Sequence, residues 1–173
     1  MCYDRKNFFK EANDMSEEKT NVMRILDQKK ISYTPHHYTH GDIAPDGVTV
    51  ARLTGLDPDT VFKTLVTAGA SKKNYVFVIP VVKELDLKAA AKAVGEKSIS
   101  MIRQSELLPL TGYVHGGCSP IGMKKALPTV IDVSAQALDS MAVSAGKVGF
   151  QVQLSPGDLA GLVRASFFSV AGE

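Results

Sequence analysis

Apolar and polar positions alternate along the chain with two different periods, and the longer period predicts a helix near the start. In the segment 20–30, Val22, Ile25 and Leu26 recur at helical spacing, so they would lie on one face of a helix. Thr20 precedes them and can accept a hydrogen bond from the first turn. We therefore expect the first helix to start after Thr20 and to end near Lys30.

The shorter period, in which every second residue is apolar, predicts strands. Segments 61–68 and 75–82 are rich in β-branched and aromatic residues and are separated by the polar turn 69–74, so they predict a hairpin. Pro35 biases Thr34 away from the helical conformation, which favours an extended segment over residues 35–38. Further strands are expected at 98–102, 129–133, 141–144 and 149–154.

The remaining helices are indicated by residues typical of helix termini. Residues 48–53 are followed by Gly55, and the alanine-rich segment that starts at Asp86 is followed by Gly95. Ser155 and Pro156 are typical of a helix start, and residues 104–108 predict one more short helix. Because no internal repeat or low-complexity linker interrupts this order, the sequence predicts one mixed α+β domain over residues 20–173.

Composition restricts the class of protein more than its activity. The chain has 173 residues, of which 45% are hydrophobic and 22% charged, as in an ordinary globular protein. Its net charge is only +2, which lacks the strong positive field of proteins that grip long stretches of nucleic acid. Any contact with RNA is therefore expected to be local.

The start of the chain and the cysteines predict a cytoplasmic protein. Residues 1–19 are rich in charge and lack the apolar core of a secretory signal, so we expect them to form a loose, solvated tail. No apolar run approaches the roughly 18 residues needed to cross a bilayer. Cys2 and Cys118 are too few for a disulfide framework, which favours a reducing compartment.

Lys63 is the first candidate for a functional residue. It lies between bulky apolar neighbours in a predicted strand, where alternate side chains share a face, so it would lie with Val61 and Leu65. A lysine on an apolar face must extend its ammonium to water, pair with an acid or serve a site, because its charge is costly to bury alone. The pattern alone leaves these alternatives open.

The glycine-rich loop 112–122 is the second candidate. It reads Gly-Tyr-Val-His-Gly-Gly-Cys-Ser-Pro-Ile-Gly, and glycine lets backbone N–H groups approach a ligand oxygen closely. Such a loop can form an oxyanion hole or a tight corner of a sheet, and both interpretations stay open. His115 and Cys118 in this loop could form an activated thiol, but no third residue orients them, so we favour a buried, unreactive cysteine.

The sequence predicts neither a metal site nor a cofactor. A histidine cluster near Asp42 comprises His36, His37 and His40, but its spacing matches no standard zinc pattern and is typical of a solvated loop. No phosphate-binding P-loop or dinucleotide fingerprint occurs, and no pair of acids has a spacing that marks a general acid and base.

Several short motifs, taken in order, resemble the YbaK family, the free-standing relatives of the editing insertion of prolyl-tRNA synthetase. The resemblance extends from about Thr20 to the C-terminus. It rests on the ordered set Phe62-Lys63-Thr64-Leu65, Leu87-Lys88-Ala89-Ala90, Thr111-Gly112-Tyr113, Gly116-Gly117-x-Ser119-Pro120-x-Gly122 and Ser155-Pro156-x-Asp158-Leu159. It implies an α+β domain with a mixed, mostly antiparallel sheet or a partly closed barrel, flanked by helices.

The resemblance also implies an activity and a site. The activity is hydrolysis of the ester in mischarged aminoacyl-tRNA, most often Cys-tRNA(Pro), in which the substrate's own thiol attacks its carbonyl. Lys63, Gly116 and Gly117 would be the catalytic residues, with the two glycine amides stabilising negative charge. Lys63 would anchor the ribose or phosphate of the tRNA end or assist in stabilising charge, and we favour anchoring. Tyr38 and Ser144 would position the substrate.

Two residues depart from the family pattern. Gln151, the third expected substrate-binding residue, lies where some relatives have an acid, so a carboxylate role there is not expected. Cys118 replaces an ordinary aliphatic residue, which argues further against a protein thiol nucleophile.

Three functional hypotheses therefore remain. They are a Cys-tRNA(Pro) deacylase that contacts the acceptor end and prolyl-tRNA synthetase, a deacylase for Ala- or Ser-tRNA that uses water, and a binding module for aminoacyl-tRNA or a synthetase.

Overall fold

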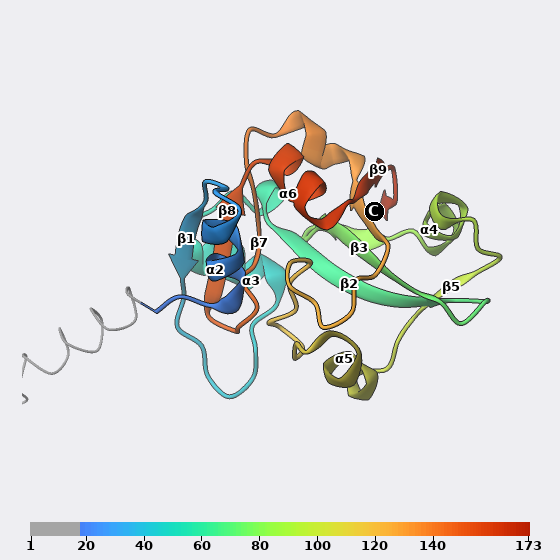
Figure 1. Ribbon diagram of the computed structural model, residues 1–173, viewed down its shortest axis with the longest axis horizontal. Coiled ribbons are helices and arrows are strands. Elements are labelled where there is room, and N and C mark those ends of the chain that lie inside the picture. Colours follow the sequence, from blue (N-terminus) through green and yellow to red (C-terminus); the bar gives the residue numbers. More distant parts are fainter. Residues whose placement is uncertain (1–17) are drawn as a thin grey trace, which may run out of the picture.

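The fold places two β-sheets side by side around a shared apolar core. This computed structural model describes residues 18–173 (Figure 1). Its larger sheet has five strands in the order β5-β2-β3-β6-β9, a three-stranded sheet has the order β1-β8-β7, and a small ladder joins β10 to β4. The predicted tail 1–19 lies outside the described residues, except for the exposed Glu18 and Lys19.

The elements follow one another in a mixed order along the chain. The helices and 3-10 turns are α2 (Asn21–Gln28), α3 (Gly47–Thr54), η1 (Pro58–Thr60), α4 (Leu87–Val94), α5 (Gln104–Thr111), η2 (Val133–Ala137) and α6 (Pro156–Val163). The strands are β1 (Thr34–His37), β2 (Phe62–Gly69), β3 (Asn74–Pro80), β4 (Glu84–Leu85), β5 (Ile99–Met101), β6 (Thr129–Asp132), β7 (Met141–Ser144), β8 (Phe150–Leu154), β9 (Ser166–Phe168) and β10 (Ala171–Gly172).

The predicted hairpin forms the centre of the larger sheet. Strands β2 and β3 pair antiparallel, with Lys63 opposite Ile79, and they run side by side through the middle of the molecule (Figure 1). Strands β3 and β6 are parallel, as are β6 and β9, so the sheet is mixed. The fold is therefore α+β with mixed, mostly antiparallel sheets, as predicted, and the sheets do not close into a barrel.

The structure confirms the predicted start of the first helix and the predicted ends of the next two. Thr20 Oγ1 accepts a hydrogen bond from Met23 N–H at 3.3 Å at the start of α2. Gly55 and Gly95 end α3 and α4 with φ near +72°, a conformation that glycine adopts without strain. Helix α5 extends to Thr111, beyond the expected end at residue 108, and contains Pro109.

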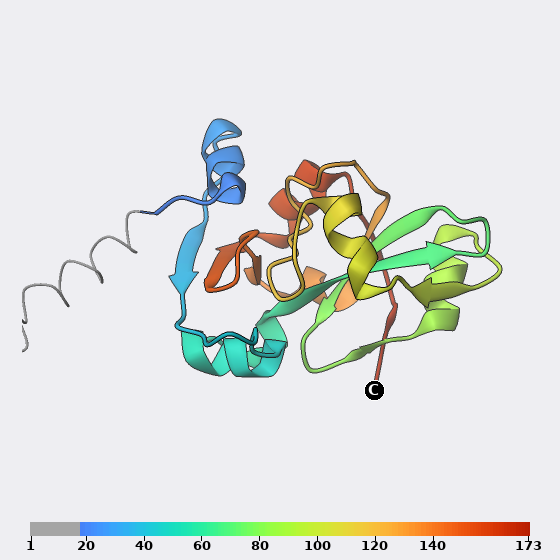
Figure 2. The same ribbon diagram turned by 90° about the horizontal axis from the view of Figure 1, so that it is seen from below.

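Strand β3 is buried on both faces and separates two apolar clusters. Val76 and Val78 pack with α2, α6 and the three-stranded sheet, whereas Phe77 and Ile79 pack with the alanine face of α4. Figure 2 shows α2 and β1 at one end of the molecule, with β5 and α4 at the other. None of the helices among residues 18–173 is long and apolar enough to cross a membrane.

Asp132 fixes the C-terminal segment to the larger sheet. Its side chain is buried, Oδ1 accepts hydrogen bonds from Val170 N–H and Ala171 N–H at 3.0 Å, and Oδ2 accepts one from Ser134 N–H at 3.2 Å. Burial alone raises the pKa of Asp132, but hydrogen bonds from Ser134, Val170 and Ala171 outweigh it and hold the pKa below its ordinary value. The ionised form is therefore stabilised by folding.

We predict that Asp132→Ala lowers the free energy of unfolding by about 3 kcal/mol at pH 7, because it leaves buried N–H groups without acceptors. Since folding lowers this pKa, the contribution is present above the unfolded value of about 4 and disappears as the pH falls through the folded value. Urea denaturation between pH 7 and pH 3 measures both effects. The exposed Asp139, changed to alanine, serves as the control, and an equal loss in both variants would contradict the prediction.

Candidate functional site

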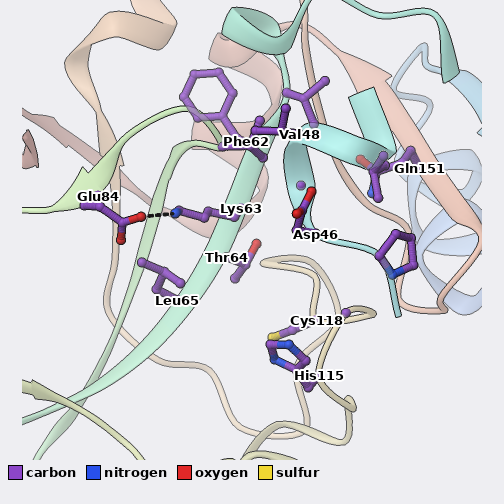
Figure 3. A pocket seen from close by; sticks show the side chains of 16 residues that line it. Asp46, Val48, Phe62, Lys63, Thr64, Leu65, Glu84, His115, Cys118 and Gln151 are labelled. Atoms are coloured by element: carbon purple, nitrogen blue, oxygen red, sulfur yellow. Dashed lines mark ion pairs between the residues drawn. The ribbon is translucent and has the colours of Figure 1, made fainter. Parts of the chain in front are cut away.

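A cavity of about 510 Å³ lies where β2, the start of α3, the glycine-rich loop and β8 meet (Figure 3). Its polar lining comes from segments that are far apart in the sequence. These residues are Asp46, Lys63, Thr64, Glu84, His115 and Gln151. Apolar walls from β2 and α3 complete it, so a small ligand with both polar and apolar groups can enter.

Lys63 lines this cavity together with Val61 and Leu65, the residues expected to share its face. Its side chain is 28% exposed, and Nζ lies 3.6 Å from Glu84 Oε1. Glu84 itself is 82% exposed, so solvent screens the pair and its net contribution is small. Thus the ammonium is neither deeply buried nor tightly held, and an anionic ligand can compete with Glu84 for it.

Gly116 brings the glycine-rich loop against the segment that precedes α3. Its φ is +84°, and a Cβ at this position would lie 2.4 Å from Ala44 Cβ, so both the conformation and the close approach require glycine. Gly116 lines the cavity, as expected. Among residues 18–173 its N–H has no hydrogen-bond acceptor, so it can donate to a ligand.

The expected role of Gly117 as a second amide donor needs correction. Its N–H donates to Val114 O at 3.0 Å, within the loop itself, and Gly117 does not line the cavity. A Cβ here would lie 3.0 Å from Val148 N, so this glycine serves close backbone packing instead. The loop therefore makes a tight backbone corner at Gly117 and leaves the N–H of Gly116 without an acceptor among the described residues.

Tyr38 and Ser144 do not line the cavity. Tyr38 is 5% exposed, and its N–H donates to Gly149 O at 3.0 Å. Burial raises the pKa of Tyr38 above its ordinary value. Ser144 is 8% exposed, and its Oγ accepts a hydrogen bond from Gly146 N–H at 3.3 Å. Direct contact of either residue with a ligand in this cavity is therefore not supported.

Gln151 is the predicted residue that projects most clearly into the cavity from the smaller sheet. It lies on β8, directly opposite Ser144 on β7, and is 6% exposed. Its Oε1 is buried and has no hydrogen-bond donor among the described residues. Because buried polar atoms in folded proteins are normally paired, this oxygen is suited to a ligand donor.

Asp46, Thr64 and Glu84 line the cavity but were not expected there. Asp46 caps α3, where Oδ1 accepts a hydrogen bond from Thr49 N–H at 2.7 Å, so the sequence indicates only a helix start. Thr64 follows Lys63 in a strand, where alternation would send it to the other face, and its buried Oγ1 has no partner among residues 18–173. Nothing in the sequence signals that Glu84 reaches Lys63.

Cys118 also lines the cavity, but its chemistry is that of an unreactive thiol. Burial raises the pKa of Cys118 to about 12, against a weaker opposing effect of a hydrogen bond with Thr111. A thiol that stays protonated at neutral pH is a poor nucleophile. This supports the interpretation of Cys118 as an unreactive residue, although its side chain is only partly buried.

The histidine cluster near Asp42 is divided among separate contacts. His36 Nε2 and Gln153 Oε1 lie 2.9 Å apart, His37 packs edge-on against Phe150 at 4.8 Å between ring centroids, and His40 Nδ1 lies 2.8 Å from Gly41 O. Within the described part of the chain, no group of three or more His, Cys, Asp or Glu side chains could hold one metal ion.

Comparison with known proteins identifies sequence relatives. Residues 44–162 match the family model of the aminoacyl-tRNA editing domain. The chain is 40% identical over 159 residues to EbsC of Enterococcus faecalis, covering 92% of this chain and 97% of that protein, whose name proposes a Cys-tRNA(Pro)/Cys-tRNA(Cys) deacylase. It is 27% identical over 117 residues to a proline–tRNA ligase of Shouchella clausii, covering 65% of this chain but only 20% of that larger enzyme.

Solved structures share the fold at low sequence identity. One, described as a proposed trans-editing enzyme for prolyl-tRNA synthetase, superposes with a TM-score of 0.75 at 20% identity, covering 90% of this chain and all of that one. Another, the hypothetical protein APE2540, gives a TM-score of 0.79 at 20% identity and covers 88% of this chain. At this identity the structural likeness shows the fold alone.

We predict that Cys118 in the folded protein resists alkylation, because its thiol is partly buried and stays protonated. In a Cys2→Ser variant, where Cys118 is the remaining cysteine, iodoacetamide at pH 8 should react about a hundredfold more slowly than with the same protein unfolded in urea. Mass spectrometry of timed samples measures the rate. Equal rates in the folded and unfolded protein would show an accessible thiolate and contradict this description of the cavity.

Proposed function

The chain belongs to the aminoacyl-tRNA editing domain family, and we propose that it hydrolyses mischarged aminoacyl-tRNA, with Cys-tRNA(Pro) as its substrate. The relative from E. faecalis, matched over nearly its whole length, carries a name that proposes this activity. The observation that carries the proposal is that Lys63 and the free amide of Gly116 line one cavity. A cation and an amide donor are the groups that an ester at the end of an RNA requires.

The bond-breaking step uses the sulfur of the substrate. The cysteine thiolate attacks its own ester carbonyl, so a carbon–sulfur bond forms and the bond between the carbonyl carbon and the ribose oxygen breaks. The ribose oxygen takes up the proton that the thiol released, and water then opens the cyclic thioester to free cysteine. An intramolecular thiol needs only the correct rotamer, and its pKa of about 8.5 supplies some thiolate at neutral pH.

Lys63 anchors the ribose or phosphate at the 3′ end of the tRNA in this proposal. Its ammonium is partly exposed and paired only with the solvent-screened carboxylate of Glu84. A phosphate offers more negative charge and more acceptor oxygens than this carboxylate, so it can replace Glu84 as the partner. The alternative, in which Lys63 stabilises the developing charge directly, requires the ammonium to turn away from Glu84.

Gly116 supplies the amide that stabilises the developing oxyanion, and the role first expected for Gly117 is withdrawn because its N–H is already donated.

Tyr38 and Ser144 act as positioning residues. Ser144 lies opposite Gln151 across β7 and β8, and the hydrogen bond from Tyr38 N–H to Gly149 O fixes the residue just before β8. Both therefore determine where Gln151 enters the cavity.

The partners in this proposal follow from the substrate. The acceptor end of an aminoacyl-tRNA enters the cavity, and with a net charge of +2 the chain has little attraction for the rest of the tRNA. We therefore assign the choice of tRNA to prolyl-tRNA synthetase, which binds the same tRNA, and the site of action to the cytoplasm, where translation takes place.

We predict that Lys63→Ala lowers kcat/KM for Cys-tRNA(Pro) at least about tenfold, because a charge-assisted contact to the tRNA end is lost. Lys63→Arg should retain part of the activity, since it keeps the charge but changes the geometry. Release of radiolabelled cysteine under single-turnover conditions measures both variants. Lys83→Ala, an exposed lysine outside the cavity lining, is the matched control and should keep full activity. Full activity in Lys63→Ala would exclude the anchoring role.

A second prediction concerns the sulfur of the substrate. On the same tRNA, replacing cysteine with serine should lower the single-turnover rate at least about a hundredfold, because a hydroxyl hardly ionises at neutral pH. Comparable rates for Cys-, Ser- and Ala-tRNA(Pro) would favour a deacylase that uses water. Tight binding of Cys-tRNA(Pro) without release of cysteine would favour a binding module.

A further inference from the structure

The charged groups of the cavity are unevenly paired. Apart from His115, the ionisable side chains that carry charge there are Asp46, Lys63 and Glu84. Lys63 and Glu84 pair with each other at 3.6 Å. For Asp46, no lysine, arginine or histidine nitrogen of residues 18–173 lies within ion-pair distance. Asp46 is therefore a carboxylate of the cavity without an ion pair in the described structure, and Arg52 on the same helix adds only a weaker, longer-range attraction.

Asp46 is held in place by the helix that it caps. Oδ1 accepts the hydrogen bond from Thr49 N–H at 2.7 Å, and the side chain is exposed at the mouth of the cavity. Hydrogen bonds from the backbone and the side chain of Thr49 lower the pKa of Asp46 below its ordinary value, so this carboxylate is ionised at neutral pH. The carboxylate is therefore fixed by the fold and still accessible to a ligand.

Gln151 adds a second, independent acceptor to the same cavity. Its side chain is 94% buried, since only 6% of its surface is exposed, and its Oε1 lacks any donor in the described structure. Figure 3 shows Gln151 on the side of the cavity opposite Glu84 and Lys63, with Asp46 between them. The Lys63 ammonium is turned toward Glu84 and does not satisfy either acceptor (Figure 3).

We propose that the α-ammonium group of the esterified amino acid binds between the carboxylate of Asp46 and Oε1 of Gln151. This inference rests on the proposed function and deepens it by naming the residues that recognise the amino acid backbone. An ammonium carries three N–H donors and a positive charge, so it satisfies an unpaired carboxylate and an unpaired amide oxygen together. The ligands of this subsite are α-amino acid esters with a free amino group.

The position of Asp46 explains how a neutral glutamine can serve in this subsite. Asp46, at the start of α3, supplies the negative charge. The buried side-chain amide of Gln151 on β8 orients the ammonium through a hydrogen bond, without the larger desolvation penalty of a buried carboxylate. When the substrate fills the cavity and excludes water, the attraction between the ammonium and Asp46 becomes stronger. An amino group fixed in this way restricts rotation about the bond between Cα and the carbonyl carbon, which favours attack by the thiol.

The test compares Cys-tRNA(Pro) with an analogue that lacks only the amino group, tRNA(Pro) esterified with 3-mercaptopropionic acid. Single-turnover kcat/KM is measured for both substrates with the wild-type protein and with Asp46→Asn and Gln151→Leu. Asparagine caps helices as well as aspartate does, so Asp46→Asn removes charge while preserving the start of α3. The ratio of the two substrates in each variant is divided by the wild-type ratio, which cancels the difference in their intrinsic thiol reactivity.

The expected result is a loss confined to the substrate with an amino group. Asp46→Asn and Gln151→Leu should each lower kcat/KM for Cys-tRNA(Pro) about tenfold and change it little for the desamino substrate. Two matched controls should keep the wild-type ratio. Asp57→Asn alters the cap of η1 outside the cavity lining, and Gln153→Leu alters a glutamine on β8 whose amide is already bonded to His36 and Ser140.

The outcomes separate this inference from the proposed function. Equal losses on both substrates in Asp46→Asn and Gln151→Leu would overturn the ammonium subsite, as would full activity of both variants on Cys-tRNA(Pro). Failure of the wild-type protein to release the acyl group from either substrate would instead overturn the proposed deacylase. Circular dichroism and thermal unfolding of each variant confirm that the fold is retained before the ratios are compared.

Discussion

One apolar contact holds the two sides of the cavity together. Val61 forms a parallel bridge to Ala142 and thereby joins the larger sheet to β7 of the smaller one, and both residues are 1% exposed. Ala51 of α3 and Val81 complete this small cluster. Lys63 lies two residues beyond the bridge, and Asp46 lies at the end of the helix that the cluster anchors. A single packed cluster therefore sets the positions of the cation and the carboxylate relative to each other.

The glycine-rich loop imposes a second constraint, which is steric. Gly116 packs against Ala44 and Gly117 against the backbone at Val148, at distances that leave no space for a side chain. These contacts fix the loop where Gly116 lines the cavity, yet they leave the Gly116 N–H without an acceptor in the described structure. The same packing thus provides a rigid backbone amide, a donor suited to an oxyanion.

Sequence reasoning predicts those features that depend on local interactions. The caps at Thr20 and Ser155, the left-handed ends at Gly55 and Gly95, and the central hairpin all follow from neighbouring residues. Sequence reasoning does not predict the parallel pairing of β9 with β6 or the short ladder of β10 with β4, because both depend on contacts across the fold. Within the site, strand alternation predicts that Lys63 shares a face with Val61 and Leu65, and all three line the cavity. Asp46 appears in the sequence only as a helix cap, because the cavity that it lines is made by distant segments.

The thiol of Cys118 and the thiol of the substrate cysteine must differ in reactivity if the proposed enzyme is to cleave Cys-tRNA(Pro) and spare Pro-tRNA(Pro). Cys118 lines the cavity, and a reactive protein thiolate there could attack the ester of any aminoacyl-tRNA, including correctly charged Pro-tRNA(Pro). Burial raises the pKa of Cys118 to about 12, which keeps it protonated and suppresses this reaction. Discrimination then rests on the substrate, because proline brings no nucleophile of its own. A cavity that recognises only the shared backbone of amino acids can in this way be selective for cysteine by its reactivity.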